Sequence, residues 1–320
     1  MISVIIPVYN CKTTLPDVLH GLAQQKPDSE MFEVIVVDDG STDGSQFIAR
    51  EFSATSPVWT AFLSQPNQGA AAARNTGIQQ ARGEILLFLD ADIIPTPTLL
   101  AEHAAFHRTH PAVTDAVRGR VILSPAIDLS QQVVLDQTYL KDEQPLETRI
   151  AWTDFVTNNI SLKQRLLTEN NLRFDERMLR NEDVELGYRL TQVGLRLFYH
   201  SGAVGYHHHP MTLAKHIERA KIHSRSYAIW FNRQPHLKNE LVKMGKEQNY
   251  GFVTRQSRFA RKVKHYGKTV LVNGLTVHLL TMLGQMALRR RGELARQFFR
   301  HVYQYYFRTN LRRQTRLLAR

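Results

Sequence analysis

The chain has 320 residues, of which 43% are hydrophobic and 22% are charged, so one or two folded domains are expected and wholesale disorder is excluded. Its single cysteine, Cys11, excludes an intrachain disulfide framework and a zinc site built on several cysteines. The formal net charge of +12 is typical of proteins that meet a nucleic acid, a membrane surface or a phosphorylated substrate.

The positive charge lies at one end of the chain. Residues 250–320 contain 16 Lys and Arg and one acid, Glu293, whereas the preceding residues contain 25 Lys and Arg and 28 Asp and Glu. This asymmetry indicates that the basic segment contacts an anionic surface. Met1 leads into an apolar run that Pro7 interrupts, without the features of a secretory signal, so we expect a cytoplasmic body.

Residues 1–110 alternate short apolar runs with segments of helical period. The apolar runs predict buried strands over Ser3–Val8, Val34–Val37, Trp59–Leu63 and Ile85–Leu89. Helices are predicted after a cap at Thr13 or Thr14, over Ala70–Ala81, and after Thr96-Pro97. This alternation predicts a parallel α/β sheet, whose ligands bind beyond the carboxyl ends of the strands.

Residues 111–210 predict a mixed region, and the pattern beyond Pro210 is helical. The strands predicted in the mixed region are Val117–Leu123, Phe155–Ser161, Leu195–Tyr199 and Ala203–Tyr206, with a helix from Glu182 to Val193 capped by Asn181. Later helices are predicted over Thr212–Phe231, around Val263–Leu288 and over Glu293–Leu318. We therefore predict one domain over residues 1–210 and a helical basic extension over 211–320.

Acidic side chains follow two of the predicted strands. One strand runs into Asp38-Asp39-Gly40, and another runs into Asp90-Ala91-Asp92. Because the carboxyl ends of parallel strands meet at one edge of a sheet, these carboxylates are expected to lie together. An Asp-x-Asp pair suits a hard divalent cation, although each pair alone is also typical of a polar turn.

A cation and a further acidic cluster lie at predicted helix starts. Arg74 is in the second turn after Gly69, which suits a diphosphate group or an ordinary surface position. Glu182, Asp183 and Glu185 lie in the first turn of a later helix. They either complement the helix dipole or supply a general base for a hydroxyl group.

Three consecutive histidines, His207, His208 and His209, follow a predicted strand. Neutral imidazole is a good ligand for Mn²⁺-like metals, and exposed loop histidines are the alternative. We expect His208 to face solvent, and the metal contact stays open between His207 and His209.

Five segments together resemble the inverting glycosyltransferases of family 2, of the non-processive type. They are SVIIPVYN at 3–10, VDDGSTD at 37–43, AARNTG at 72–77, LDAD at 89–92 and NEDVEL at 181–186. The resemblance covers roughly residues 1–210. It implies the GT-A fold, with a Rossmann-like, mostly parallel sheet flanked by helices, a nucleotide-binding part over 1–110 and an acceptor-binding part over 111–210.

The resemblance also implies roles for individual residues. The nucleotide sugar would be bound by Pro7, Tyr9, Asp39, Arg74, Asp90 and Ala91. A Mn²⁺ or Mg²⁺ ion would be held by Asp92, Asp90 and His207. On the acceptor side, Asp183 would be the catalytic base, and the acceptor would contact Glu182, Asn158 and Asn159.

The implied reaction is a single displacement that moves one sugar from a nucleotide-sugar donor, with a UDP-sugar favoured, to an acceptor hydroxyl. The Gln-x-x-Arg-Trp motif of processive polysaccharide synthases is absent from the sequence, which favours one sugar per encounter. The expected role is in cell-surface glycan, polysaccharide or glycolipid biosynthesis, with a glycan or lipid-linked acceptor.

The basic segment contains a nearly uncharged run, Thr269–Leu288, which is long enough to span a bilayer. Polar and apolar side chains gather on opposite sides of its helical wheel, which favours a helix lying on an anionic membrane surface. A spanning helix and a helix packed on the body or on a second copy are the alternatives. We thus expect a peripheral protein on the inner face of the cell membrane.

Two rival functions fit parts of the sequence. A sugar-1-phosphate nucleotidyltransferase also combines a nucleotide-binding sheet with Asp-x-Asp chemistry, but the loop from Pro7 to Lys12 has no glycine. A nucleic-acid-binding protein would use the basic segment. Acidic strand ends do not favour it, so no nucleic-acid partner is expected.

Overall fold

The computed structural model describes residues 1–26, 31–127, 147–208 and 213–237, together with 302, 306–307, 310–311 and 313–314. The chain divides into two compact units. The first comprises Met1–Ile127 and Thr138–His209, and the second comprises Asp128–Gln137 and Pro210–Arg320.

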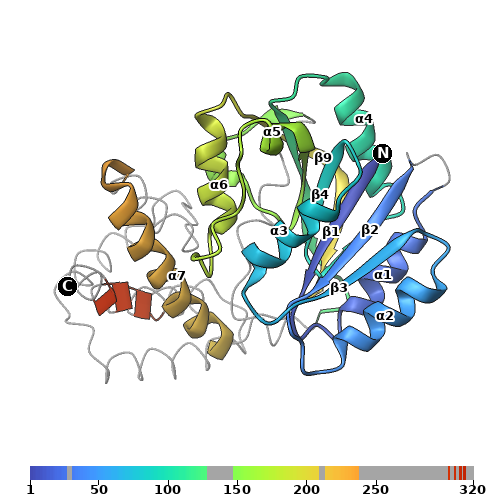
Figure 1. Cartoon of the computed structure of the whole chain (residues 1–320), viewed down its shortest axis with the longest axis horizontal. Helices are drawn as coiled ribbons and strands as arrows, with labels where there is room; N and C mark the ends of the chain where they lie inside the picture. The colour runs from blue at the N-terminus through green and yellow to red at the C-terminus, as the bar shows by residue number, and fades with distance from the viewer. Residues whose placement is uncertain are drawn as a thin grey trace, which may run out of the picture. The chain divides into compact units, whose positions relative to one another are not determined.

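The first unit is built on one sheet (Figure 1), whose described strands have the order β3-β2-β1-β4-β8-β6-β9-β5, with β7 paired to β9. The strands are β1 Ile2–Val8, β2 Phe32–Asp38, β3 Thr60–Ser64, β4 Ile85–Leu89, β5 Ile93–Pro95, β6 Asp115–Leu123, β7 Thr148–Arg149, β8 Asn159–Lys163 and β9 Arg196–His207. The strands β3, β2, β1 and β4 are parallel neighbours, as the alternation of strands and helices predicts.

Strand β8 reverses direction between β4 and β6. Its first residue, Asn159, therefore lies opposite Leu89, the last residue of β4. The carboxyl ends of the parallel strands and the start of β8 share one edge of the sheet. We call this the carboxyl edge and define it by residues 8–10, 38–41, 64–69, 89–92 and 157–159.

Helices cover both faces of the sheet (Figure 1). They are α1 Leu15–Ala23, α2 Ser45–Thr55, α3 Ala70–Gln80, α4 Leu99–Thr109, α5 Gln164–Thr168 and α6 Glu182–Thr191. Successive strand residues point to opposite faces: Val4 and Ile6 of β1 belong to the core with α1, α2 and α4, whereas Ile5 belongs to the core with α3, α5 and α6. This three-layer packing explains why the strands read as continuous apolar runs.

Several elements differ from the sequence-based expectation. The structure adds α2 and β5, which the pattern did not reveal. The strand expected from Phe155 begins only at Asn159, because a short 3₁₀ helix, η3 Trp152–Asp154, precedes a turn. The two short strands expected over Leu195–Tyr199 and Ala203–Tyr206 form the single strand β9, whose pairing with β6 shifts register between Gly119 and Arg120.

The two predicted N-cap residues also do not make the capping hydrogen bonds that were expected of their side chains. Thr14 and Asn181 occupy the N-cap positions of α1 and α6, but neither side chain bonds to the helix backbone. The Thr14 hydroxyl instead donates a hydrogen bond to the carbonyl oxygen of Ala91 at 2.8 Å. Asn181 adopts the left-handed region, with a φ of 59°, in which its side chain no longer caps the helix.

The second unit contains α7 Leu213–Arg233 and a 3₁₀ turn, η4 Pro235–Leu237. Tyr227 in α7 is buried, and its ring lies 5.3 Å from that of Phe307 in an edge-to-face contact. The helices expected around residues 263–288 and over most of 293–318 lie outside the described residues. Of the helices that the structure describes, none is both long and apolar enough to cross a bilayer.

Candidate functional site

The carboxyl edge collects the residues that were predicted to bind a donor. Tyr9 follows β1 and is 50% exposed, while Pro7 is half-buried in the strand. Val8 of β1 is in register with Asp38 of β2, and Asp90 follows the neighbouring strand β4. The parallel strands therefore bring both acidic motifs to one edge, as expected.

Asp39 is buried and holds the loop that follows β3. One of its carboxylate oxygens accepts hydrogen bonds from the side chain of Gln65 at 2.8 Å and the backbone N–H of Gln68 at 2.9 Å. The other accepts from the backbone N–H of Gly69 at 2.7 Å. These bonds fix the entry to α3, which carries Arg74. A contact between Asp39 and a nucleotide stays a prediction.

Gly40 makes the turn after Asp39 with a φ of 76°, a conformation that side chains rarely adopt. A Cβ atom at this position would lie 2.9 Å from the backbone nitrogen of Asn67. Conformation and space both require glycine, because the loops after β2 and β3 approach each other closely here.

Arg74 joins the two acidic clusters. It is 4% exposed in α3, and its two terminal nitrogens donate to Glu182 at 2.6 Å and to Asp90 at 2.8 Å. Burial lowers the pKa of Arg74, but the adjacent carboxylates of Asp90 and Glu182 raise it overall. An always-charged arginine thus links the end of β4 to the start of α6.

Asp183 lies in the first turn of α6, beside Glu182. Its Oδ1 accepts from the backbone N–H of Val184 at 2.7 Å, and its Oδ2 accepts from that of Thr157 at 3.2 Å. Burial and the charge of Glu182 raise the pKa of Asp183 to about 6, although Arg74 acts to lower it. A carboxyl group with a pKa close to neutral pH suits general base catalysis.

The second acid of the Asp90-Ala91-Asp92 pair contacts the histidine segment. The Oδ2 of Asp92 lies 3.4 Å from the Nε2 of His207. This contact follows from the pairing of β5 with β9, which sets Ile93 opposite His207. Ala91, between the two acids, is buried.

His208 departs from its expected solvent-exposed position. It is half-buried, its backbone N–H donates to the carbonyl oxygen of Asp92 at 2.8 Å, and its Nδ1 lies 3.1 Å from the hydroxyl of Ser124. His209, the alternative metal ligand, lies outside the described residues.

The side chains of Asp92 and His207 fit a divalent cation that also takes oxygens from a substrate. Mg²⁺ typically binds one or two carboxylates and substrate phosphates, and Mn²⁺ also accepts imidazole. Burial and the charge of Asp92 raise the pKa of Asp90, against the effect of Arg74, so a cation here would offset the repulsion. Among the described side chains, no three potential ligands gather to hold an ion by themselves.

The two asparagines that were predicted to contact the acceptor, Asn158 and Asn159, have different environments in the structure. Asn159 has no exposed surface; its amide donates to the carbonyl oxygen of Ala203 at 2.9 Å and its Oδ1 lies 2.9 Å from a ring nitrogen of His103. It is therefore part of the sheet interior, not of the site surface. The Oδ1 of Asn158 is buried at the carboxyl edge, without a hydrogen-bond partner among the described residues.

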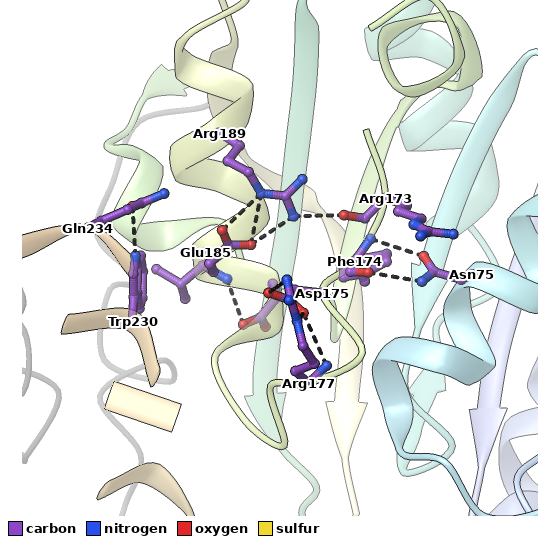
Figure 2. Close-up of polar contacts among 11 residues, drawn as sticks. Asn75, Arg173, Phe174, Asp175, Arg177, Glu185, Arg189, Trp230 and Gln234 are labelled. Carbon is purple, nitrogen blue, oxygen red and sulfur yellow. Dashed lines mark hydrogen bonds and ion pairs between the residues drawn. The ribbon is translucent and has the colours of Figure 1, made fainter. Parts of the chain in front are cut away.

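Sequence reasoning missed the residues that hold the segment before α6. Asn75 donates to the carbonyl oxygen of Phe174 and accepts from its N–H, both at 3.0 Å, and Figure 2 shows the two side by side. Arg189 pairs with Glu185 at 2.7 Å and donates to the carbonyl oxygen of Arg173 at 2.7 Å. Asn75 directly follows Arg74 in the AARNTG segment, a position that could have drawn attention to it.

Comparisons with known proteins place these features in a family. The model of Glycosyl transferase family 2 matches residues 3–167. The uncharacterized glycosyltransferase YfnE of Bacillus subtilis (strain 168) is 30% identical over 258 residues, 65% of each chain. Poly(ribitol-phosphate) beta-N-acetylglucosaminyltransferase TarS of Staphylococcus aureus (strain Mu50) is 29% identical over 57% of this chain and 30% of its own length. The chain thus spans less than two thirds of these curated relatives.

Solved structures share the fold. Mannosyltransferase PcManGT from Pyrobaculum calidifontis, in complex with GDP-Man and Mn²⁺, superimposes with a TM-score of 0.64 at 20% identity, over 97% of this chain and 86% of its own. S. aureus TarS 1-349 in complex with UDP-GlcNAc gives a TM-score of 0.56 at 19% identity, over 96% of this chain and 92% of its own. The GT-A fold expected from the sequence is confirmed by these likenesses.

Proposed function

Because the chain belongs to glycosyl transferase family 2, we propose that it is an inverting transferase that moves one sugar from a nucleotide-sugar donor to an acceptor hydroxyl. The observation that carries the proposal is the ion-paired group at the carboxyl edge, in which Arg74 contacts both Asp90 and Glu182. It brings the donor-side acids and the proposed base, Asp183, into one cluster.

In the proposed reaction, Asp183 accepts the proton of the acceptor hydroxyl. The acceptor oxygen forms a bond with the anomeric carbon on one face, and the bond from that carbon to the diphosphate oxygen breaks on the opposite face. The products are a glycoside of inverted configuration and a nucleoside diphosphate. The pKa of Asp183, raised to about 6, leaves this carboxylate largely ionised at pH 7 and still basic enough to take the proton.

Asp92 and His207, together with Asp90 two positions before Asp92 in the sequence, would hold the Mn²⁺ or Mg²⁺ ion. When bound, the ion supplies positive charge that stabilises the leaving diphosphate. PcManGT, which shares the fold, is described in complex with Mn²⁺, in keeping with this assignment.

The donor and acceptor sides use different residues. Tyr9 offers an exposed ring to a nucleotide base, and Pro7 and Asp39 lie near the carboxyl ends of the paired strands β1 and β2. We favour a UDP-sugar, and the TarS complex with UDP-GlcNAc provides one example in this fold. On the acceptor side, the amide oxygen of Asn158 has no hydrogen-bond partner within the part of the chain that the structure describes.

We further propose that the acceptor is a glycan or lipid-linked glycan of the cell surface. Residues 250–320, with 16 basic residues and one acid, would bring the enzyme to an anionic membrane surface from the cytoplasmic side. One sugar would be transferred in each encounter.

A thermal-shift panel tests the proposed donor class. UDP-GlcNAc, UDP-glucose and GDP-mannose are each added with and without MnCl₂ to the full chain and to the Asp92→Asn variant. We expect one donor to raise the melting temperature of the wild type in a Mn²⁺-dependent manner, and Asp92→Asn to lose the Mn²⁺-dependent part. His208→Gln is the matched control and should keep it. No shift with any of the donors would contradict the proposal.

A further inference from the structure

Arg74 is poorly placed for the direct diphosphate contact that the family resemblance implies. Its side chain is 5% exposed, and each terminal nitrogen already donates to a carboxylate, one to Glu182 and one to Asp90. Its third nitrogen, Nε, is buried with no hydrogen-bond partner among the described residues. Little of the guanidinium group is therefore left to meet a ligand.

The surroundings of Arg74 fix its position from a third side. Its guanidinium carbon lies 5.6 Å from the ring centroid of Phe174, within range of a cation–π interaction. The Phe174 ring makes an edge-to-face contact with Phe88 of β4 at 5.3 Å, and Asn75 bonds the Phe174 backbone. Two consecutive residues of α3 thus hold this arrangement: Arg74 makes the ion pairs, and Asn75 holds the backbone of Phe174.

The two partners of Arg74 belong to segments with different proposed roles, one on the donor side and one beside the proposed base. Asp90 directly follows β4 on the proposed donor side, and Glu182 precedes the proposed base in the first turn of α6. The residues lie far apart in sequence, and buried Arg74 joins buried Glu182 of α6 to the partly exposed Asp90 that follows β4. A buried carboxylate that loses its arginine partner is strongly disfavoured, so the bridge constrains both segments.

We infer that Arg74 is a positioning residue, which sets the placement of the base on α6 relative to the donor-side carboxylate of β4 by binding Glu182 and Asp90 together. This inference rests on the proposed function. It assigns Arg74 a role in the transfer step and not in the affinity for the nucleotide.

The test separates affinity from turnover in full-length variants. The donor used is the one that gives the largest shift in the thermal-shift panel. Calorimetry measures the affinity of each variant for the corresponding nucleoside diphosphate in the presence of MnCl₂. Hydrolysis of the donor measures turnover. For Arg74→Met we expect a dissociation constant within about 3-fold of wild type, and kcat lower by about 100-fold or more. Arg74→Lys keeps one positive charge and should recover part of kcat.

Arg82→Met is the matched control. Arg82 also pairs with a buried glutamate, Glu33, at 2.8 Å and stacks on an aromatic ring, Trp59, at 3.6 Å. Glu33 is adjacent to Ser3 at the amino ends of β1 and β2, the opposite edge of the sheet. This variant should keep both kcat and nucleotide affinity, so that loss of a paired arginine alone does not explain the Arg74 result.

A double variant checks that Arg74 acts through Glu182. If it does, the double variant Glu182→Gln/Arg74→Met should lower kcat by a smaller factor than the product of the factors measured for the two single variants. A folded Arg74→Lys or Arg74→Met protein that loses nucleotide affinity as much as turnover would overturn the inference, since a direct donor contact predicts that result. A wild type that neither binds nor hydrolyses any donor would contradict the proposed function itself.

Discussion

Asp183 illustrates how single residues acquire their chemistry from the fold. An aspartate in a first helical turn usually complements the helix dipole, which keeps it ionised. Here burial and the neighbouring charge of Glu182 raise its pKa to about 6, while Arg74 limits the rise.

The first prediction concerns the pH dependence of turnover. A raised pKa keeps Asp183 protonated up to higher pH, so kcat/KM for donor hydrolysis should fall as the pH drops below about 6. Glu182→Gln removes a negative neighbour, which favours the ionised form of Asp183, and the acidic limb should move to lower pH. The pH–rate profile measures this, and a limb that stays in place or moves upward contradicts the assignment.

The spacing of residues in the sequence predicted the acidic motifs of the site, but it could not predict contacts between residues that are far apart in the chain. The acids at 38–39 and 90–92 were found because apolar runs end directly before them. The Arg74–Glu182 bridge joins residues 108 positions apart, and no local pattern reports such a contact. Likewise, the burial of Asn159 depends on its pairing opposite Leu89 across β8 and β4.

At the scale of elements, apolar runs revealed the buried strands more reliably than they revealed exposed helices. Helix α2 was not predicted: its fully buried residues are the small Ser45 and Ala49, and its larger apolar residues Ile48 and Phe52 are only partly buried against the core. Strand β5 has only three residues. Its existence depends on pairing with β9, which the sequence does not encode locally.

Helix α4 and strand β8 share a buried polar cluster. His103 and His107 each lie 2.8 Å from the hydroxyl of Ser161, and the Nζ of Lys163 lies 3.3 Å from the other ring nitrogen of His107. Burial lowers the pKa of His103 to about 4, and burial with the charge of Lys163 lowers that of His107 to about 2. Both rings are therefore neutral in the folded protein at pH 5–7.

The second prediction follows from this cluster. Below pH 6.5 the unfolded chain binds protons at these histidines and the folded chain does not, so stability is lost as the pH falls from about 6.5 towards 4. Each histidine contributes a slope of about 1.4 kcal/mol per pH unit. Urea unfolding of His103→Gln at several pH values should show a shallower slope than wild type, whereas exposed His20→Gln should not. Equal slopes for all three proteins would contradict the prediction.

At the scale of the molecule, the net charge of +12 does not describe the unit that carries the site. The basic residues concentrate in residues 250–320, whereas Asp39, Asp90 and Asp92 lie at the carboxyl edge of the first unit and Asp183, in the first turn of α6, contacts this edge at Thr157. The proposed membrane location would therefore account for the charge of the chain better than the proposed chemistry does. Composition alone could not make this distinction, because it does not report which residues fold together.

The third prediction tests that location. The full chain should float with vesicles that contain anionic phosphatidylglycerol at low salt, and should remain behind with neutral phosphatidylcholine vesicles. Raising the salt should release it, because exposed charges are screened. Replacing Arg289, Arg290 and Arg291 by glutamine should weaken flotation without changing donor hydrolysis. A chain that stays in the soluble fraction at low salt would contradict membrane docking.

The central claim is that Asp183 activates a hydroxyl for direct displacement of a nucleoside diphosphate. Proton NMR of donor hydrolysis tests it most directly, with water as the acceptor and the α-linked donor of largest thermal shift. The first sugar released should be the β anomer, formed together with the nucleoside diphosphate, and Asp183→Asn should bind the donor normally while releasing sugar about 100-fold more slowly or worse. Release of the α anomer first, or near-wild-type release by Asp183→Asn, would contradict the claim.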